Sequence, residues 1–229
     1  MPELTFRIGE VKPLVYAAVP TLRAPLQIRN ATPDERVQSI VLNCQVQIET
    51  LGRPYSAVEG AKLLDLFGER ERWSRTMKPM LWVNSVVKVP AFEAETTVDL
   101  MLPCTLDFDV AATKYFYGLD AGEIGITVLF SGTVFYAGSD GATQIAQIPW
   151  DREARFRLPV GVWKRAIDAH YADTVWLRLP KEVFERFYIY KVARGIPTWE
   201  QAIGQPLDRV ETEEVRETLA TVGGVSDEF

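Results

Sequence analysis

The sequence predicts a mainly β protein with added α-helices: an antiparallel β-sandwich that carries an inserted helix and a C-terminal helical extension. Two observations lead to this fold class. Through most of the first 150 residues, apolar and polar residues alternate with a period of two, in many short runs without regular intervening helices. After Trp150 the apolar spacing changes to the 3.6-residue period of α-helices. A parallel α/β sheet would instead alternate strands with helices.

The clearest predicted strand is Ile40–Ile48, in which every second residue is apolar, so that one face of the strand is buried. A strand at 22–28 contains Pro25, which has no amide hydrogen to donate, and we therefore expect it at a sheet edge. The remaining predicted strands are 4–8, 81–89, 96–102, 123–137 and 142–148, the last following an Asp140-Gly141 hairpin turn. Many short strands of this kind are typical of immunoglobulin-like or C2-like sandwiches.

One helix interrupts the strands. Ser56 and Glu59 have capping-box spacing, in which each side chain can bond the other residue's backbone amide. Apolar residues follow at helical spacing until Gly68, which predicts a helix at about 56–67. After the strands, the same periodicity predicts helices at about 159–171 and 180–194.

These elements divide the chain into three parts. We expect a sandwich over 1–156, with a helical insertion at about 56–76, and a helical extension over 157–207 that packs on it. An acidic, mobile tail is predicted over 208–229, because this segment is mostly polar and has no aromatic residue before Phe229.

Charge is concentrated in that tail. It holds seven acids and two bases, a net charge of −5 out of −6 for the whole chain. The near-neutral body argues against nucleic-acid binding, which requires a field of one sign. No apolar run approaches the roughly 20 residues of a membrane span, and the N-terminus does not resemble a signal peptide. We therefore predict a cytoplasmic protein with no membrane span and no nucleic-acid partner.

No catalytic constellation is recognisable in the sequence. His170 is the only histidine, and we expect it to have a packing or surface role. Cys44 continues the inward face of its strand, and neither it nor Cys104 has a sequence partner for redox or nucleophilic chemistry. Glycine-rich phosphate loops are absent as well. We predict unpaired thiols, no cofactor and no metal site.

Two short segments are the best candidates for ligand contacts. Asp107 and Asp109 place two carboxylates on one face of a predicted extended segment, as a C2-like calcium site would. Lys114 and Tyr115 begin a mixture of basic and aromatic residues. The ordinary interpretation of both segments is solvated acids at a strand edge and core aromatics.

Several motifs resemble one bacterial family. The main ones are Leu63–Glu69 with Arg72-Trp73, Pro103–Thr105 with Asp107–Val110, Leu129–Tyr136, Pro149–Asp151, and Leu158–Val160 with Trp163. Over residues 3–204 the chain resembles an uncharacterised domain-of-unknown-function family (DUF6084-like) that is often encoded beside high-affinity uptake NiFe hydrogenases. The resemblance implies a non-catalytic accessory protein whose partner is a hydrogenase subunit or another co-encoded protein. It assigns no catalytic residue.

The candidate binding residues are therefore Asp107, Asp109, Lys114, Tyr115, Trp150 and Asp151. Two alternatives to an accessory role stay open. One is an enzyme with a pocket between sandwich and helices, whose best acids include Asp151 and Glu153. The other is a C2-like module that binds calcium or lipid. For a protein partner, the sequence suggests two contact routes: the Pro25 strand as an open edge, and the acidic tail.

Overall fold

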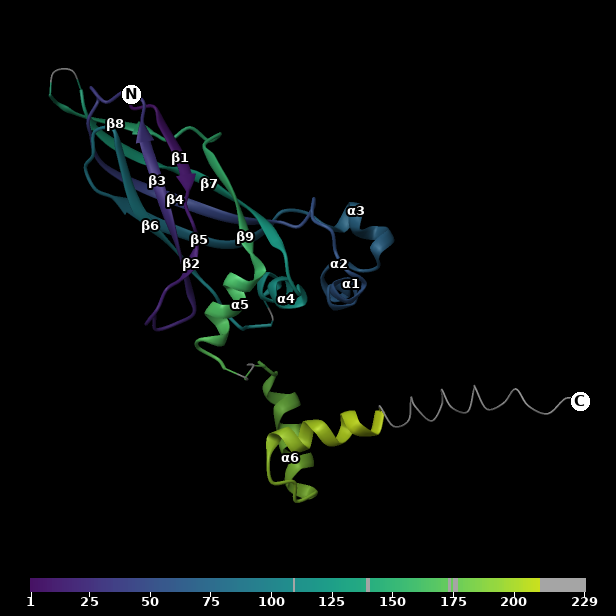
Figure 1. The fold of residues 1–229 in the computed structure, drawn as a ribbon. Helices are drawn as coiled ribbons and strands as arrows, with labels where there is room; N and C mark the ends of the chain where they lie inside the picture. The colour runs from purple at the N-terminus through teal and green to yellow at the C-terminus, as the bar shows by residue number, and fades with distance from the viewer. Residues whose placement is uncertain (109, 139–140, 173, 175–176, 211–229) are drawn as a thin grey trace, which may run out of the picture. The chain divides into compact units, whose positions relative to one another are not determined.

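The computed structural model describes residues 1–210 except 109, 139–140, 173 and 175–176. The described chain falls into two compact units, Met1–Leu177 and Arg178–Phe229, and each is described by itself (Figure 1). The first unit holds all the strands of the described chain and most of its helices. The second holds only helices among its described residues.

The first sheet is antiparallel and is centred on its longest strand. β3 pairs with β1 and β2 on one side and with β6 on the other. The bounds are β1 Leu4–Ile8, β2 Lys12–Pro13, β3 Thr21–Asn30 and β6 Glu95–Pro103.

The second sheet is also antiparallel and is built around the two longest strands, β4 and β7. Its order is β5-β4-β7-β8, and β9 pairs with the other half of β7. The bounds are β4 Val37–Glu49, β5 Met80–Val89, β7 Glu123–Ala137, β8 Thr143–Gln147 and β9 Glu153–Pro159. β7 changes partner from β9 to β8 near Gly132, whose φ of 140° favours glycine.

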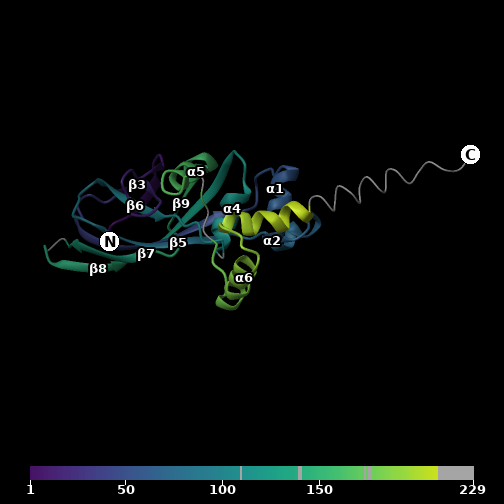
Figure 2. The same ribbon diagram turned by 90° about the horizontal axis from the view of Figure 1, so that it is seen from below.

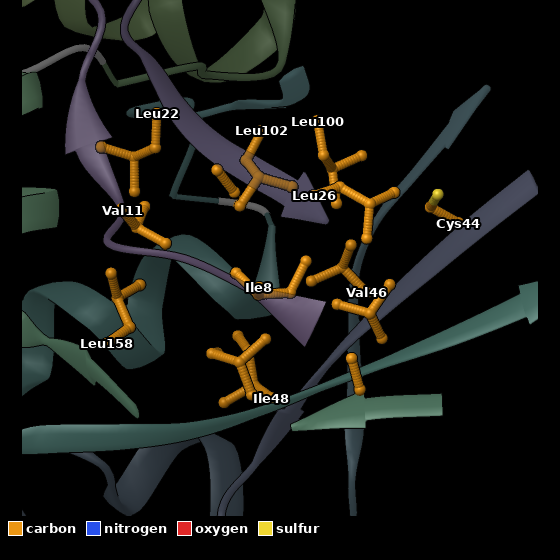
Figure 3. Close-up of a cluster of buried hydrophobic side chains, with 14 of the residues drawn as sticks. Ile8, Val11, Leu22, Leu26, Cys44, Val46, Ile48, Leu100, Leu102 and Leu158 are labelled. Carbon is orange, nitrogen blue, oxygen red and sulfur yellow. The ribbon is translucent and has the colours of Figure 1, made fainter. Parts of the chain in front are cut away.

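The two sheets face each other as the layers of a sandwich (Figures 1 and 2). Alternate residues of β3 and β4 point into the shared core, as the period-two pattern predicts. Figure 3 shows Ile8 and Leu26 of the first sheet beside Val46 and Ile48 of the second. The fold class predicted from the sequence, a mainly β antiparallel sandwich with helices, is therefore confirmed.

Helices gather at one end of this sandwich. The insertion between β4 and β5 forms short helices, and its Ser56–Glu59 capping box is present. α4 follows β6, and α5 follows β9 (Figure 1). The bounds are α1 Ala57–Lys62, α2 Leu64–Phe67, a 3-10 turn at Arg70–Arg72, α3 Trp73–Thr76, α4 Ala111–Gly118 and α5 Val160–Asp168. In the second unit, α6 spans Lys181–Ala193 and a further helix covers 199–210.

The prediction of an edge position for Pro25 is wrong. Pro25 lies in β3, the central strand, opposite Asp99 of β6. Its carbonyl accepts the amide of Gly9 at 2.8 Å, so its nitrogen faces the gap between the end of β1 and the start of β2. A missing donor costs no ladder bond where the neighbouring strand is interrupted. Strand addition at Pro25 is therefore not available as a contact route.

Two other segments differ from expectation. Asp107 does not lie on an extended strand: its carbonyl accepts the amide of Val110 at 3.0 Å, in a turn that leads into α4. α4 itself was not predicted. At the other end, residues 208–210 continue the helix that begins at 199, so the polar segment is helical where it starts. Residues 211–229 of the predicted tail lie outside the described chain.

Candidate functional site

The second unit is a helical hairpin organised around Trp199. α6 ends at Ala193, Gly195 follows with a φ of 61° that allows the chain to turn, and the next helix begins at Trp199. The indole ring of Trp199 lies 5.5 Å, centroid to centroid, from the rings of both Phe184 and Phe187. The Lys191 ammonium sits 5.3 Å above the Trp199 ring and also donates to a loop carbonyl. Aromatic packing and one cation–π contact thus hold the two helices together.

This hairpin leaves most of its large apolar side chains exposed. Among its described residues only Ile196 and Ala202 are buried. On each helix, three large apolar residues recur at four-residue spacing and so share one face. Together they form what we call the apolar stripe: Phe184, Tyr188, Val192, Trp199, Ile203 and Leu207, with exposed fractions between 37% and 58%. An exposed apolar surface of this kind makes the hairpin a candidate for contact with another protein.

A buried polar network fastens the insertion to the helical end of the sandwich. The Tyr115 side chain, from α4, is fully buried, and its hydroxyl lies 2.8 Å from the Tyr55 hydroxyl. Tyr55 in turn donates to the carbonyl of Thr50. Next to the tyrosines, the Arg53 guanidinium donates to Glu59 Oε1 at 2.8 Å, and both side chains are more than nine-tenths buried. These contacts join the β4–β5 insertion to α4.

Glu59 is the centre of that network. Its carboxylate also accepts the backbone amides of Ser56, at 2.9 Å, and Asp120, at 3.0 Å. Burial raises the pKa of Glu59, but these amide hydrogen bonds and the Arg53 guanidinium outweigh it, so that the net pKa lies below the ordinary value. Burial raises the pKa of Tyr115, and the hydrogen bond to Tyr55 adds to the increase. The network is therefore a charged carboxylate with neutral tyrosines.

The candidate residues predicted from the sequence do not form one site. Tyr115 belongs to the buried network, and Lys114 on α4 is paired with Asp65 of α2. Trp150 is 91% exposed, in the turn between β8 and β9, and Asp151 beside it is exposed as well. Asp107 lies partly buried in the turn before α4.

Asp109, the sixth candidate, lies outside the described residues. The turn that carries Trp150 and Asp151 is fastened to the middle of β7, because Phe130 donates its amide to the Arg152 carbonyl at 2.9 Å. Lys114 and Tyr115, by contrast, are bonded to the insertion. The sequence analysis missed Tyr55 as the partner of Tyr115, because sixty residues separate the two tyrosines, and it missed the Arg53–Glu59 pair beside them.

The two cysteines and the single histidine lie in surroundings that suit a role in packing. Cys44 and Cys104 are both buried and unpaired, as predicted, and burial raises the pKa of each thiol to about 12. His170 bridges two backbone segments: its Nδ1 lies 3.0 Å from the Ala166 carbonyl and its Nε2 lies 3.0 Å from that of Ala17. This fits the packing role that we expect for His170.

Within the described ranges, no three side chains of histidine, cysteine, aspartate or glutamate gather as metal ligands would. No helix in the same part of the chain has the length and apolar character needed to cross a bilayer.

Comparison with solved structures finds distant likenesses. A CARDB domain from Pyrococcus furiosus, crystallised in complex with di-metal ions, is 12% identical, with 69% of this chain and 86% of that domain covered and a TM-score of 0.27. β-Glucosidase 3B from Thermotoga neapolitana, in complex with α-D-glucose, is 19% identical, with 68% of this chain but only 17% of the enzyme covered and a TM-score of 0.25.

No curated protein matches the sequence. A family model, in contrast, matches residues 1–215, which is nearly the whole chain and includes all of the first unit and most of the second. The match begins at the first residue of the sandwich unit and passes the end of the described hairpin. The chain belongs to a family of unknown function, DUF6084.

Proposed function

We propose that this chain is a non-catalytic protein-binding protein, and that its contact element is the apolar stripe of the C-terminal hairpin. The observation that supports the proposal is the open surface of the two helices. α5 and α6 differ in how many residues they bury. α5, the shorter helix, buries five of its nine residues, including Trp163. α6, with thirteen residues, buries none.

A hairpin with this much exposed apolar surface has little packing to stabilise its helices. Short helices are marginal in water and depend on the packing of an apolar face. Each half-exposed side chain of the stripe would contribute about 1 kcal/mol on being covered, and the six together on the order of 6 kcal/mol before the costs of association. The partner that suits such a surface is a protein with an apolar groove that binds helices.

A NiFe hydrogenase subunit, or another protein encoded with it, is the partner we propose. Support for that choice comes from the resemblance of the chain to a family often encoded beside such enzymes. The salt dependence of partner binding distinguishes two modes of contact. Binding through the apolar stripe should depend little on salt concentration, whereas an acidic tail bound to a basic surface should dissociate from its partner as the salt concentration rises. The two contact routes are therefore separable.

Affinity capture from a host that expresses hydrogenase tests the proposal. The tagged wild type is compared with Leu207→Glu, in the stripe, and with the matched control Val58→Glu. Leu207 and Val58 are 57% and 58% exposed, and a glutamate at Val58 falls in the first turn of α1, where a negative charge is favourable. We expect hydrogenase subunits, identified by mass spectrometry, with wild type and Val58→Glu at low and high salt, and none with Leu207→Glu.

Three results would contradict the proposal. The first is equal retention by Leu207→Glu. The second is loss of the subunits only at high salt or on truncation to residues 1–207, which would assign the contact to the tail. The third is a lower urea midpoint for the sandwich in free Leu207→Glu, which would mean that the stripe packs on the chain's own body. If no variant retains a subunit and deletion of the gene leaves hydrogen uptake unchanged, the accessory role is wrong.

A further inference from the structure

A pocket of about 450 Å³ opens at the helical end of the sandwich unit. This volume is in the range of sites that hold small organic molecules. Its floor consists of Leu106, Trp163 and Ile167, all almost fully buried in the core. The Trp163 ring stacks on Phe116, with centroids 5.1 Å apart and planes at 7°, so the floor is an apolar surface backed by packed aromatic rings.

The rim of the pocket carries charges of both signs. Lys62, at the end of α1, and Lys164, on α5, line it together with Asp168. Both ammonium groups lie close to one residue, because Lys62 donates to Asp120 Oδ1 at 2.7 Å and Lys164 to the Asp120 carbonyl at 3.4 Å. Two cations thus converge on one side of the opening, and the Asp120 carboxylate offsets the charge of Lys62. Lys164 has no ion pair with another described residue, so its charge is the one available to a ligand. The hydrogen bond to Asp120 raises the pKa of Lys62 and keeps that side chain charged.

Two tyrosines flank the opening. Tyr117 is 49% exposed, and its ring is held edge-on against Phe108 at 4.8 Å. Tyr171 lines the pocket from beyond the end of α5. The carbonyls at the end of a helix repel an anion, and one of those at the end of α5 is satisfied within the chain: the Ile167 carbonyl accepts the amides of His170 and Tyr171 at 2.9 Å.

We propose that this pocket binds a small organic carboxylate with a flat apolar body. The apolar floor and the tyrosine flanks would take the body of the ligand, and the two lysines would take its carboxylate, with Lys164 as the main contact because Lys62 is already paired. This site lies wholly within the Met1–Leu177 unit and is independent of the protein contact proposed for the hairpin.

The test uses two probes of the same shape, 1-naphthoate and its uncharged amide, 1-naphthamide, with the full-length protein. Backbone amide and indole NMR shifts map where each probe binds, and calorimetry gives its affinity. Lys164→Met removes the main cation, Asp168→Asn removes the negative charge of the rim, and Lys88→Met is the matched control on the exposed face of β5.

The variants should move the naphthoate affinity in opposite directions. We expect Lys164→Met to weaken it about tenfold or more, since a charge-assisted hydrogen bond is lost, and Asp168→Asn to strengthen it severalfold. Lys88→Met should leave it unchanged, and none of the three should alter naphthamide binding. Shifts should centre on Trp163 and Tyr117. Shifts outside the pocket, no binding, or equal affinities in wild type and Lys164→Met would overturn the proposal.

Discussion

Replacing Glu59 by glutamine should destabilise the sandwich unit far more than an ordinary loss of surface charge. The glutamine has the same shape, but its amide group would face a donor in either orientation. If its oxygen replaces Oε1, its NH₂ points at the Ser56 amide; if it is flipped, the NH₂ points at Arg53 and the Asp120 amide. At the same time the Arg53 guanidinium, 8% exposed, loses the one carboxylate with which it forms an ion pair among the described residues.

The magnitude follows from the burial of both groups. Removing one partner of a buried ion pair leaves an uncompensated charge and typically costs about 3–5 kcal/mol. Arg53 already has one buried nitrogen, Nη1, without a hydrogen-bond partner in the described structure, so it has little further capacity to adapt. We therefore expect Glu59→Gln to lower the free energy of unfolding by about 4 kcal/mol.

Urea unfolding followed by circular dichroism measures this loss. With a slope near ~2 kcal/mol per molar urea, the midpoint should fall by about 2 M at an unchanged slope. Glu153→Gln is the matched control: its ion pair with Arg155 is almost as short, 2.9 Å, but lies on the surface of β9, and its loss should cost less than about 1 kcal/mol. Equal midpoint shifts for the two variants would refute the assignment of Glu59 as a buried structural charge.

The difference in unfolding free energy between wild type and Glu59→Gln should depend on pH with a definite sign. The pKa of Glu59 is lowered in the folded state, so its contribution is fully present above the ordinary value of 4.5. The contribution is lost as the pH falls through the lowered pKa of the folded protein. The stability advantage of wild type over Glu59→Gln should therefore be constant between pH 7 and pH 5 and shrink below pH 4.5. An advantage that grows on acidification would contradict the direction of the shift.

Three further outcomes test other parts of the core. Tyr115→Phe should cost about 1 kcal/mol, whereas Tyr55→Phe should cost about 2 kcal/mol because it leaves the buried Tyr115 hydroxyl unpaired; a double-mutant cycle by urea unfolding should show coupling between the two. Thiol labelling without reductant should find Cys44 and Cys104 unreactive in the native protein and two free thiols after unfolding. Gly132→Ala should lower the free energy of unfolding by about 3 kcal/mol or more, since its φ is 140° and a Cβ atom would lie 2.1 Å from a carbonyl oxygen of β4; a calorimetric melting temperature like that of wild type would contradict this.

The strands were the part of the fold that sequence could predict well. A strand with one buried face leaves a period-two pattern in its own residues, so β4 and β7 are readable without knowing their neighbours. The capping box at Ser56 was equally local and is present in the structure. What such patterns do not contain is strand order, which is why the position of Pro25 was predicted wrongly.

α4 shows a second limit. Its eight residues bury both Tyr115 and Phe116 and are short enough that their aromatic content suggested a binding segment instead of a core helix. The partners of Tyr115 come from a loop some sixty residues earlier, and no spacing rule connects them. Part of the apolar stripe, in contrast, can be recognised from the sequence. Trp199, Ile203 and Leu207 follow one another at four-residue intervals, and this helical spacing continues to the predicted start of the tail.

A partner held by the apolar stripe and a carboxylate held in the pocket place separable demands on the chain. The stripe belongs to residues 184–207, and the pocket lies within Met1–Leu177. Lys164→Met should therefore spare capture of the partner, and Leu207→Glu should spare naphthoate binding. Coupling would appear only if the partner and the carboxylate changed each other's affinity, by the same factor in both directions as linkage requires. If the partner affinity is the same with and without the carboxylate, the chain has two independent binding functions. If the two affinities differ, the carboxylate regulates the partner contact.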